Sequence, residues 1–230
     1  MKLFSKTILY GLTLSAIVAL ASCGKKVEQV PVNSTNSQPQ VSYYTQESGG
    51  TSVANKTEAI KFKLEGGGEA FTLKPKSDGA KLVDKNEREL ARFNVDNKQK
   101  VKIKDASDRV LSYIVPEKGY WKIENADQTK ELYILRQQTD GDYKLEDGQN
   151  KEIYRIKKRD YGLEIETPKK QSLYKVKAKN GKIELRDASD KTILYTNVGI
   201  KPIAIACFGF DVLSREQKAA LAYAVNRSGG

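Results

Sequence analysis

From about residue 60 to residue 197 the chain consists of short stretches in which apolar and polar residues alternate, a pattern typical of β-strands with one buried face. Polar turns separate these stretches. An apolar residue recurs every 20–22 positions just before a turn, at Leu82, Ile103, Ile123, Leu145, Ile165 and Leu185. A second series follows just after the turn, at Leu90, Leu111, Leu132, Ile153, Leu173 and Ile193. Two short strands with two turns occupy about 20 residues, so the pattern predicts six successive hairpins.

Two of the turns are almost identical, in KDASDRVLSYI at residues 104–114 and in RDASDKTILYT at residues 186–196. Asp and Ser favour turns because their side chains bond to nearby backbone N–H groups. Paired aspartates also suit a calcium loop, but such a loop needs more oxygen ligands and usually an internal glycine, which neither copy has. We therefore predict hairpin turns. A further pair of stretches, IKFKL and AFTLKP around the glycines at 66–68, is an extra hairpin or a distorted first one.

The steady period limits the architecture. A propeller blade takes about 40–45 residues, so these repeats would make three blades, fewer than the four that propellers typically need. A β-helix stacks parallel coils, whereas short turns join antiparallel neighbours. The pattern therefore favours a mainly β protein, a closed antiparallel barrel of about twelve strands without edge strands. The interior of so wide a barrel must hold a plug, water or a ligand.

The C-terminal stretch supplies a candidate plug. Residues 203–213 are apolar except for Asp211, and they are too few to span a membrane as a helix. Ser214 and Gln217 form a capping-box pattern that predicts a second helix over 215–226. We expect an apolar C-terminal helix that fills the barrel. The alternative is that the apolar run forms one or two final strands, because periodicity does not settle so short a run. One face of the second helix would bear Ala220, Leu221, Ala224 and Val225.

A hairpin barrel that closes around a C-terminal apolar helix resembles the tubby C-terminal superfamily, which includes the LURP-one-related proteins. The resemblance covers about residues 60–226. It rests on the number and order of the repeats and on the segment LSREQKAALA after an apolar helix. It implies a membrane-associated, non-enzymatic barrel. Tubby itself binds phosphoinositide headgroups through basic residues, but those residues do not match positions of this chain one by one, so the ligand does not transfer.

The first residues are typical of a targeting segment. Lys2 and Lys6 make a positive start, and an apolar run without a charge follows from residue 8 to residue 21. That run is shorter than the roughly 20 apolar residues of a transmembrane helix and fits the hydrophobic region of a secretory signal. It ends in LASC at residues 20–23, which resembles the lipobox of bacterial lipoproteins.

The lipobox resemblance implies a signal peptide over residues 1–22, cleavage between Ser22 and Cys23, and a diacylglyceryl thioether on Cys23. The protein would then be a lipoprotein anchored by its acyl chains, palmitate among them, in the bacterial cell envelope. By analogy with enterobacterial sorting, Gly24 directs it to the outer membrane of a cell that has two membranes. The alternative is an ordinary signal peptide with an incidental cysteine.

A polar segment connects the lipidated cysteine to the barrel. Residues 24–58 are dominated by Ser, Thr, Asn, Gln, Gly and Pro, so they bury too little apolar surface to fold. As a flexible tether they would span roughly 30–35 Å. The expected organisation is a signal peptide at 1–22, the lipidated cysteine and tether at 23–58, and the barrel domain at 59–230.

The composition limits the kinds of catalytic and metal-binding chemistry that the chain can carry out. The chain has 40 Lys+Arg against 29 Asp+Glu, a net charge of +11, and it has two cysteines and no histidine. The usual general base near neutral pH and imidazole metal ligands are therefore missing. With Cys23 acylated, Cys207 has no disulfide partner and resembles a small buried hydrophobic residue. We expect no catalytic site, no metal site, no cofactor and no enzymatic activity.

Basic residues concentrate in residues 151–182, which hold 11 basic and 4 acidic residues. In the stretch YKVKAK, alternation places Lys175, Lys177 and Lys179 on one strand face. The candidate site for an anionic surface consists of Lys157, Lys158, Arg159, Lys169, Lys170, Lys175, Lys177 and Lys179. The alternative is a solvated outer face whose lysines discourage aggregation.

Two functions fit these features. The first is a membrane-anchored, non-enzymatic binding or structural module that docks on anionic lipid headgroups or another polyanion, with nucleic acid not expected as a partner. The alternative is a carrier that holds lipid or another hydrophobic ligand in the barrel lumen. A buried C-terminal helix would favour the first function.

The lipobox gives a direct prediction. A Cys23→Ser chain should accumulate as uncleaved precursor and lose labelling by a fatty-acid analogue, because the thiol accepts the lipid. Two or more acyl chains would hold the protein firmly, since each buried CH₂ contributes about 0.8 kcal/mol. Normal processing and labelling of this variant would show that the lipobox interpretation is wrong.

Overall fold

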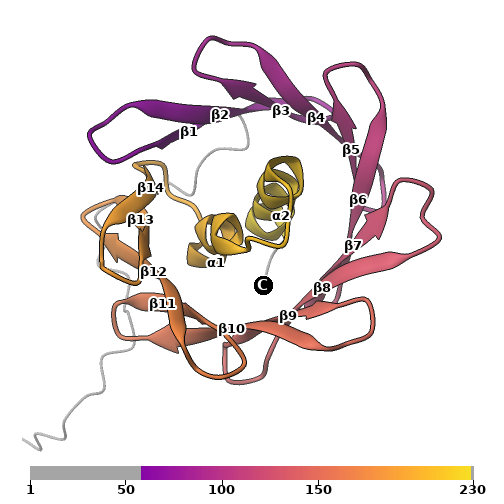
Figure 1. The fold of residues 1–230 in the computed structure, drawn as a ribbon. Helices are drawn as coiled ribbons and strands as arrows, with labels where there is room; N and C mark the ends of the chain where they lie inside the picture. The colour runs from indigo at the N-terminus through magenta and orange to yellow at the C-terminus, as the bar shows by residue number, and fades with distance from the viewer. Residues whose placement is uncertain (1–57, 229–230) are drawn as a thin grey trace, which may run out of the picture. The chain divides into compact units, whose positions relative to one another are not determined.

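The barrel predicted from the repeats is present in the computed structural model, which describes residues 58–228. The predicted signal peptide, Cys23 and most of the tether lie outside the described residues. Within them, fourteen antiparallel strands form one closed barrel in which neighbours in sequence pair and β1 pairs with β14 (Figure 1). The fold class is confirmed, with fourteen strands in place of about twelve. The strands are β1 Ile60–Lys63, β2 Glu69–Lys76, β3 Gly79–Asp84, β4 Glu89–Val95, β5 Val101–Asp105, β6 Val110–Glu117, β7 Tyr120–Asn125, β8 Glu131–Gln137, β9 Tyr143–Asp147, β10 Glu152–Arg159, β11 Gly162–Glu166, β12 Ser172–Lys179, β13 Lys182–Asp187 and β14 Thr192–Thr196.

The two additional strands are β1 and β2. They form a separate hairpin, and the turn between them contains Gly66 at φ 86° and Gly67 at φ 90°. Glycine adopts such angles without the steric cost that a Cβ imposes. The GGG segment therefore marks a true extra hairpin rather than a distorted first repeat.

The repeated turns explain the twin sequences. The Oδ1 of Asp105 accepts a hydrogen bond from the backbone N–H of Arg109 at 3.0 Å, and Asp187 does the same for Lys191 at 2.9 Å. The residue before the donor has positive φ in both copies and in the turns that end at Arg88, Lys151 and Gln171. In the longer turn that ends at Lys130 the positive φ is at Gln128, two residues before the donor. One such turn, Asp96–Lys100, follows β4. The six others follow odd-numbered strands, so they lie on one rim of the barrel, here called the Asp rim. Its turns are Asp84–Arg88, Asp105–Arg109, Asn125–Lys130, Asp147–Lys151, Thr167–Gln171 and Asp187–Lys191.

The barrel interior is filled by the C-terminal segment (Figure 1). This plug consists of helix α1 (Pro202–Ala206), the 3-10 turn η1 (Cys207–Gly209) and helix α2 (Arg215–Arg227). Helix α1 faces β11–β13, whereas α2 faces β4–β7. Ile205, Phe210 and Leu221 have no exposed surface. The predicted plug is confirmed, and the alternative of final strands is wrong because the closed wall offers no edge inside for pairing.

The apolar run differs from expectation in one respect, because it is not a single helix over 203–213. Helix α1 begins at Pro202, whose fixed φ suits the first turn of a helix, and the helical path ends at Gly209. A Cβ at Gly209 would lie 2.7 Å from Ile165 Cδ1 and 3.0 Å from a ring carbon of Tyr174. The chain turns where it meets the wall and then crosses the Asp rim.

Helix α2 begins as predicted. The N–H of Gln217 donates to Ser214 Oγ at 3.2 Å, and the N–H of Ser214 donates to Gln217 Oε1 at 3.0 Å, so the capping box is complete. Burial is broader than the one predicted face, because every residue from 219 to 225 is buried. A helix that is enclosed on all sides needs small side chains, which the alanines of this segment supply.

Polar contacts tie the plug to the wall at both rims. At the Asp rim, Tyr174 OH donates to Asp211 Oδ2 at 2.7 Å, and burial together with this carboxylate raises the pKa of Tyr174 to about 12. At the opposite rim, Trp121 Nε1 donates to Ser228 Oγ at 3.0 Å. The core, the strands and the plug all lie between Ile60 and Ser228, so the barrel closes without any other part of the chain.

Tight packing at Gly209 gives a stability prediction. Gly209→Ala should lower the free energy of unfolding by about 1–3 kcal/mol, because the added methyl group overlaps Ile165 and Tyr174. Gly68→Ala is the control, since a Cβ there meets nothing within 4 Å. Urea unfolding of both variants measures the difference, and equal midpoints would contradict a plug that is packed against the wall.

Candidate anion-binding surface

The predicted basic residues lie on β10, on β12 and on the turn between β11 and β12. Alternation places Lys157 and Arg159 on the outer face of β10, whereas Lys158 belongs to the other series and is exposed at the end of the strand. Lys175, Lys177 and Lys179 share the outer face of β12, as predicted.

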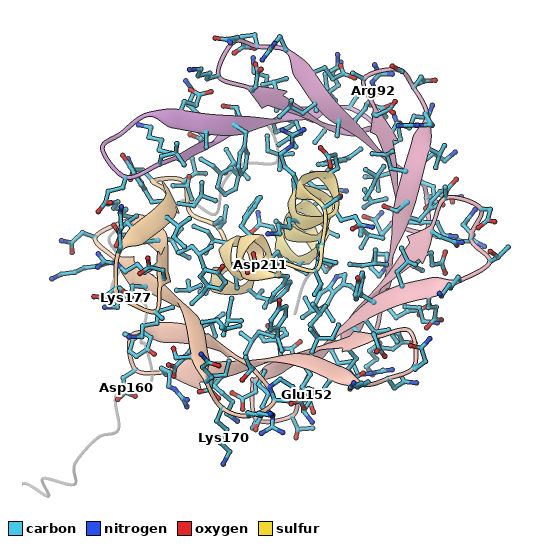
Figure 2. All side chains as sticks on the ribbon, viewed as in Figure 1. Arg92, Glu152, Asp160, Lys170, Lys177 and Asp211 are labelled. Carbon is cyan, nitrogen blue, oxygen red and sulfur yellow. The ribbon has the colours of Figure 1, made fainter. Side chains whose placement is uncertain are left out.

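The eight residues do not form one patch. The turn with Lys169 and Lys170 belongs to the Asp rim, whereas Lys179 lies at the opposite end of β12. Eight residues of strand span about 26 Å. Figure 2 shows Lys170 and Lys177 on separate parts of the outer surface.

Three of the predicted residues are held by carboxylates. Lys157 pairs with Asp142, Arg159 bonds to Glu164 Oε2 at 2.7 Å, and Lys177 lies 2.7 Å from Asp190 Oδ1. Burial by itself would raise the pKa of Asp142, but the hydrogen bonds from the Lys157 ammonium and from the backbone N–H of Lys158 outweigh it and lower this pKa. These cations neutralise carboxylates of the barrel itself and are therefore poorly placed to bind an external anion.

The other predicted residues have no ion pair within the described part of the chain, namely Lys158, Lys169, Lys170, Lys175 and Lys179. The turn Thr167–Gln171 bears two of them and lacks the aspartate of most Asp-rim turns. There the hydroxyl of Thr167 accepts the bond from the N–H of Gln171 at 3.2 Å. Replacing the carboxylate by a hydroxyl leaves this turn positive.

A shallow groove of about 770 Å³ runs over the outer face of β12 and β13 at the rim opposite to the Asp rim. Register places Lys179 opposite Lys182, and Lys175 opposite Arg186. Sequence reasoning missed Lys182 and Arg186, although the alternation in KIELR puts both on one face. The groove is lined by Tyr161, Lys177, Ala178, Lys179, Asn180, Lys182, Glu184, Arg186 and Asn197.

Charge in this groove is only partly balanced. Glu184 pairs with both Lys182 and Arg186, and its pKa is lowered because the hydrogen bonds from these cations outweigh burial, which would raise it. Like charges directly opposite each other on neighbouring strands destabilise a sheet. The pair Lys179–Lys182 is of this kind, so an anion bound between the two would relieve their repulsion.

Among residues 58–228 the one cysteine lies in the core. Burial raises the pKa of the Cys207 thiol, which donates a hydrogen bond to Ile203 O at 3.2 Å, so this residue behaves as the buried hydrophobic residue that was predicted. Among residues 58–228, no three His, Cys, Asp or Glu side chains gather as metal ligands would. In the same range, none of the helices has the length and apolar character that crossing a membrane requires.

Neither a protein-family profile nor a curated protein matches the chain. Similar solved structures include a LURP-one-related protein from Arabidopsis thaliana, 14% identical with a TM-score of 0.36, where the match covers 69% of this chain and 94% of that chain. An alternansucrase in complex with isomaltononaose is 16% identical with a TM-score of 0.17, and the match covers 56% of this chain and 12% of the other. Likenesses at these scores carry no argument, so membership of the tubby superfamily stays a prediction.

The Asp142 contact gives a prediction about pH. Asp142→Asn should lower stability at neutral pH and should reduce the stability that the protein loses on acidification. The sign follows from the lowered pKa, because such a group stabilises the folded state above its unfolded pKa and loses this effect as pH falls through the folded value. Urea unfolding at neutral pH and at roughly pH 3 tests this. If the pH dependence of the free energy of unfolding is unchanged in this variant, Lys157 does not stabilise the ionised form of Asp142.

Proposed function

We propose that the barrel is the non-enzymatic binding module of a lipoprotein of the bacterial cell envelope, and that it docks on anionic lipid headgroups. The acylated Cys23 would anchor the chain, and the docking surface would be the groove over β12 and β13. The observation that carries this proposal is the facing pair Lys179 and Lys182, with Lys175 opposite Arg186 on the same two strands. Repulsion within such pairs falls when an anion lies between them.

The magnitudes favour docking by a tethered domain. Each cation near an anionic membrane surface contributes about 1 kcal/mol, which is weak for a free protein. A tether raises the effective concentration of the domain at the membrane, so a few such contacts suffice. Ion pairing with Asp190 reduces what Lys177 adds, and ion pairing with Glu184 reduces what Lys182 adds, so Lys175 and Lys179 should contribute most.

The plug counts against the alternative of a carrier. Ile205, Phe210 and Leu221 occupy the space that a hydrophobic cargo would need in the lumen, and each is fully buried. Holding cargo there would require the plug to leave. Its polar ties at both rims oppose this movement.

Vesicle binding tests the docking surface. A soluble form that begins at Thr51 should co-sediment with anionic vesicles at low salt and be released as salt rises, because exposed charges are screened. Replacing Lys175, Lys179 and Lys182 by Gln together should weaken binding roughly 30- to 100-fold, at about 1 kcal/mol for each of the two unpaired cations and less for Lys182.

The matched control replaces three exposed lysines elsewhere on the barrel, Lys76, Lys98 and Lys118, by Gln, which removes the same charge. This control should lose much less affinity. Equal losses in the two triple variants would show attraction by net charge alone. Equal binding to neutral and anionic vesicles would refute docking through charge.

A further inference from the structure

The barrel closes through one weak seam. Strand β1 pairs with β14 through the single residue pair Lys63–Tyr195, whereas the other neighbouring strands share four to six residue pairs each. The first residues of β14 pair with β13 but therefore have no partner on the side of β1 at the Asp rim. The ion pair between Lys191 and Glu65, 3.7 Å apart and largely exposed, adds little there.

A notch of about 270 Å³ opens at this end of the seam, and its lining is mostly apolar. Phe71 and Phe208 belong to its lining, and their ring centroids lie 5.1 Å apart. At its edges stand Leu64, which is 48% exposed, and Ile193, which is 37% exposed. Apolar side chains so exposed beside an apolar hollow are typical of a binding site.

Two cations give the notch a polar end. Arg215 and Lys218, from the first turns of α2, both line it. The carboxylates that pair with them, Glu216 at 2.7 Å and Asp211 at 3.2 Å, are not among the lining residues. The notch therefore presents an apolar floor, two exposed apolar edges and, at one end, two cations that are each already paired with a carboxylate, so apolar contact must supply most of the affinity for a ligand.

We infer that this seam notch binds one single-chain amphiphile with a carboxylate head, a fatty acid, whose chain lies on Phe71 and Phe208 and whose head meets Arg215 and Lys218. The site is independent of the proposed function, since it lies at the seam and not on the outer face of β12 and β13. The site also differs from the carrier alternative, in which the lumen would hold the ligand. Here the plug stays in place, and Phe208 and Leu213 form one side of the notch.

The proposal predicts how affinity depends on the ligand. Burial contributes about 0.8 kcal/mol for each CH₂, so each added methylene should tighten binding roughly fourfold until the notch is full. Exposed charge contacts contribute less, so dodecanol should bind about two- to fivefold more weakly than dodecanoate. Docking through a headgroup alone would show no dependence on chain length.

Calorimetric titration of the form that begins at Thr51 with octanoate, decanoate and dodecanoate, each below its micelle concentration, tests the inference. The form contains every residue of the closed barrel. Leu64→Gln and Ile193→Gln should each weaken dodecanoate binding tenfold or more, because both remove apolar edge contacts without touching the buried core. Val212→Gln is the matched control, since Val212 is 39% exposed near the same rim but does not line the notch.

One-to-one binding that tightens with chain length, falls in the two edge variants and persists in the control supports the inference. Absence of dodecanoate binding overturns it, and so does an equal loss in Val212→Gln. If a form that starts at Glu58 binds dodecanoate and the form that starts at Thr51 does not, the occupant of the notch would be the chain's own residues 51–57. Urea unfolding of Leu64→Gln and Ile193→Gln shows whether each variant folds. If one of them misfolds, the other still tests the inference.

Discussion

The width of the barrel is the constraint on which the rest of the structure depends. Fourteen strands enclose more space than the inward side chains of the wall can fill, and an empty apolar lumen of that size would be costly. The chain meets this constraint with its last residues, which return through the lumen as two short helices (Figure 1). Alanines on α2 and the bare backbone at Gly209 let these helices approach the wall closely.

Repetition made most of the wall predictable from the sequence. The turns are local, because Asp105 and Asp187 bond to backbone groups four residues away, so their period could be read directly. The capping box at Ser214 is local for the same reason. The strand number was underestimated because the β1–β2 hairpin lacks the aspartate turn. The end of α1 depends on Ile165 and Tyr174, which lie far from Gly209 in sequence, so no local pattern predicted it.

Long-range pairing also limited what could be predicted of the candidate site. Alternation correctly placed Lys175, Lys177 and Lys179 on one face. It gave no sign that Lys157 is bonded to Asp142, because Asp142 lies just before β9 and meets Lys157 only through the pairing of β9 with β10. In contrast, Lys182 faces Lys179 across a two-residue turn, so local reasoning could have found this contribution of β13. The cluster of charges in the sequence therefore overstated the available cations on β10 and left out the cations of β13, which share Glu184.

Closure of the barrel explains why apolar surface remains at one place. Each hairpin joins strands that are adjacent in sequence, so local turns fix their register, whereas β1 and β14 must meet across the whole domain. The plug is held inside by contacts with all sides of the wall, which leaves little freedom to adjust this last pairing. Residues on both sides of the seam, Leu64 and Ile193, stay exposed there as a result. Of the large apolar side chains that are exposed in the described part of the chain, these two flank the seam, whereas Tyr161 and Val212 lie elsewhere.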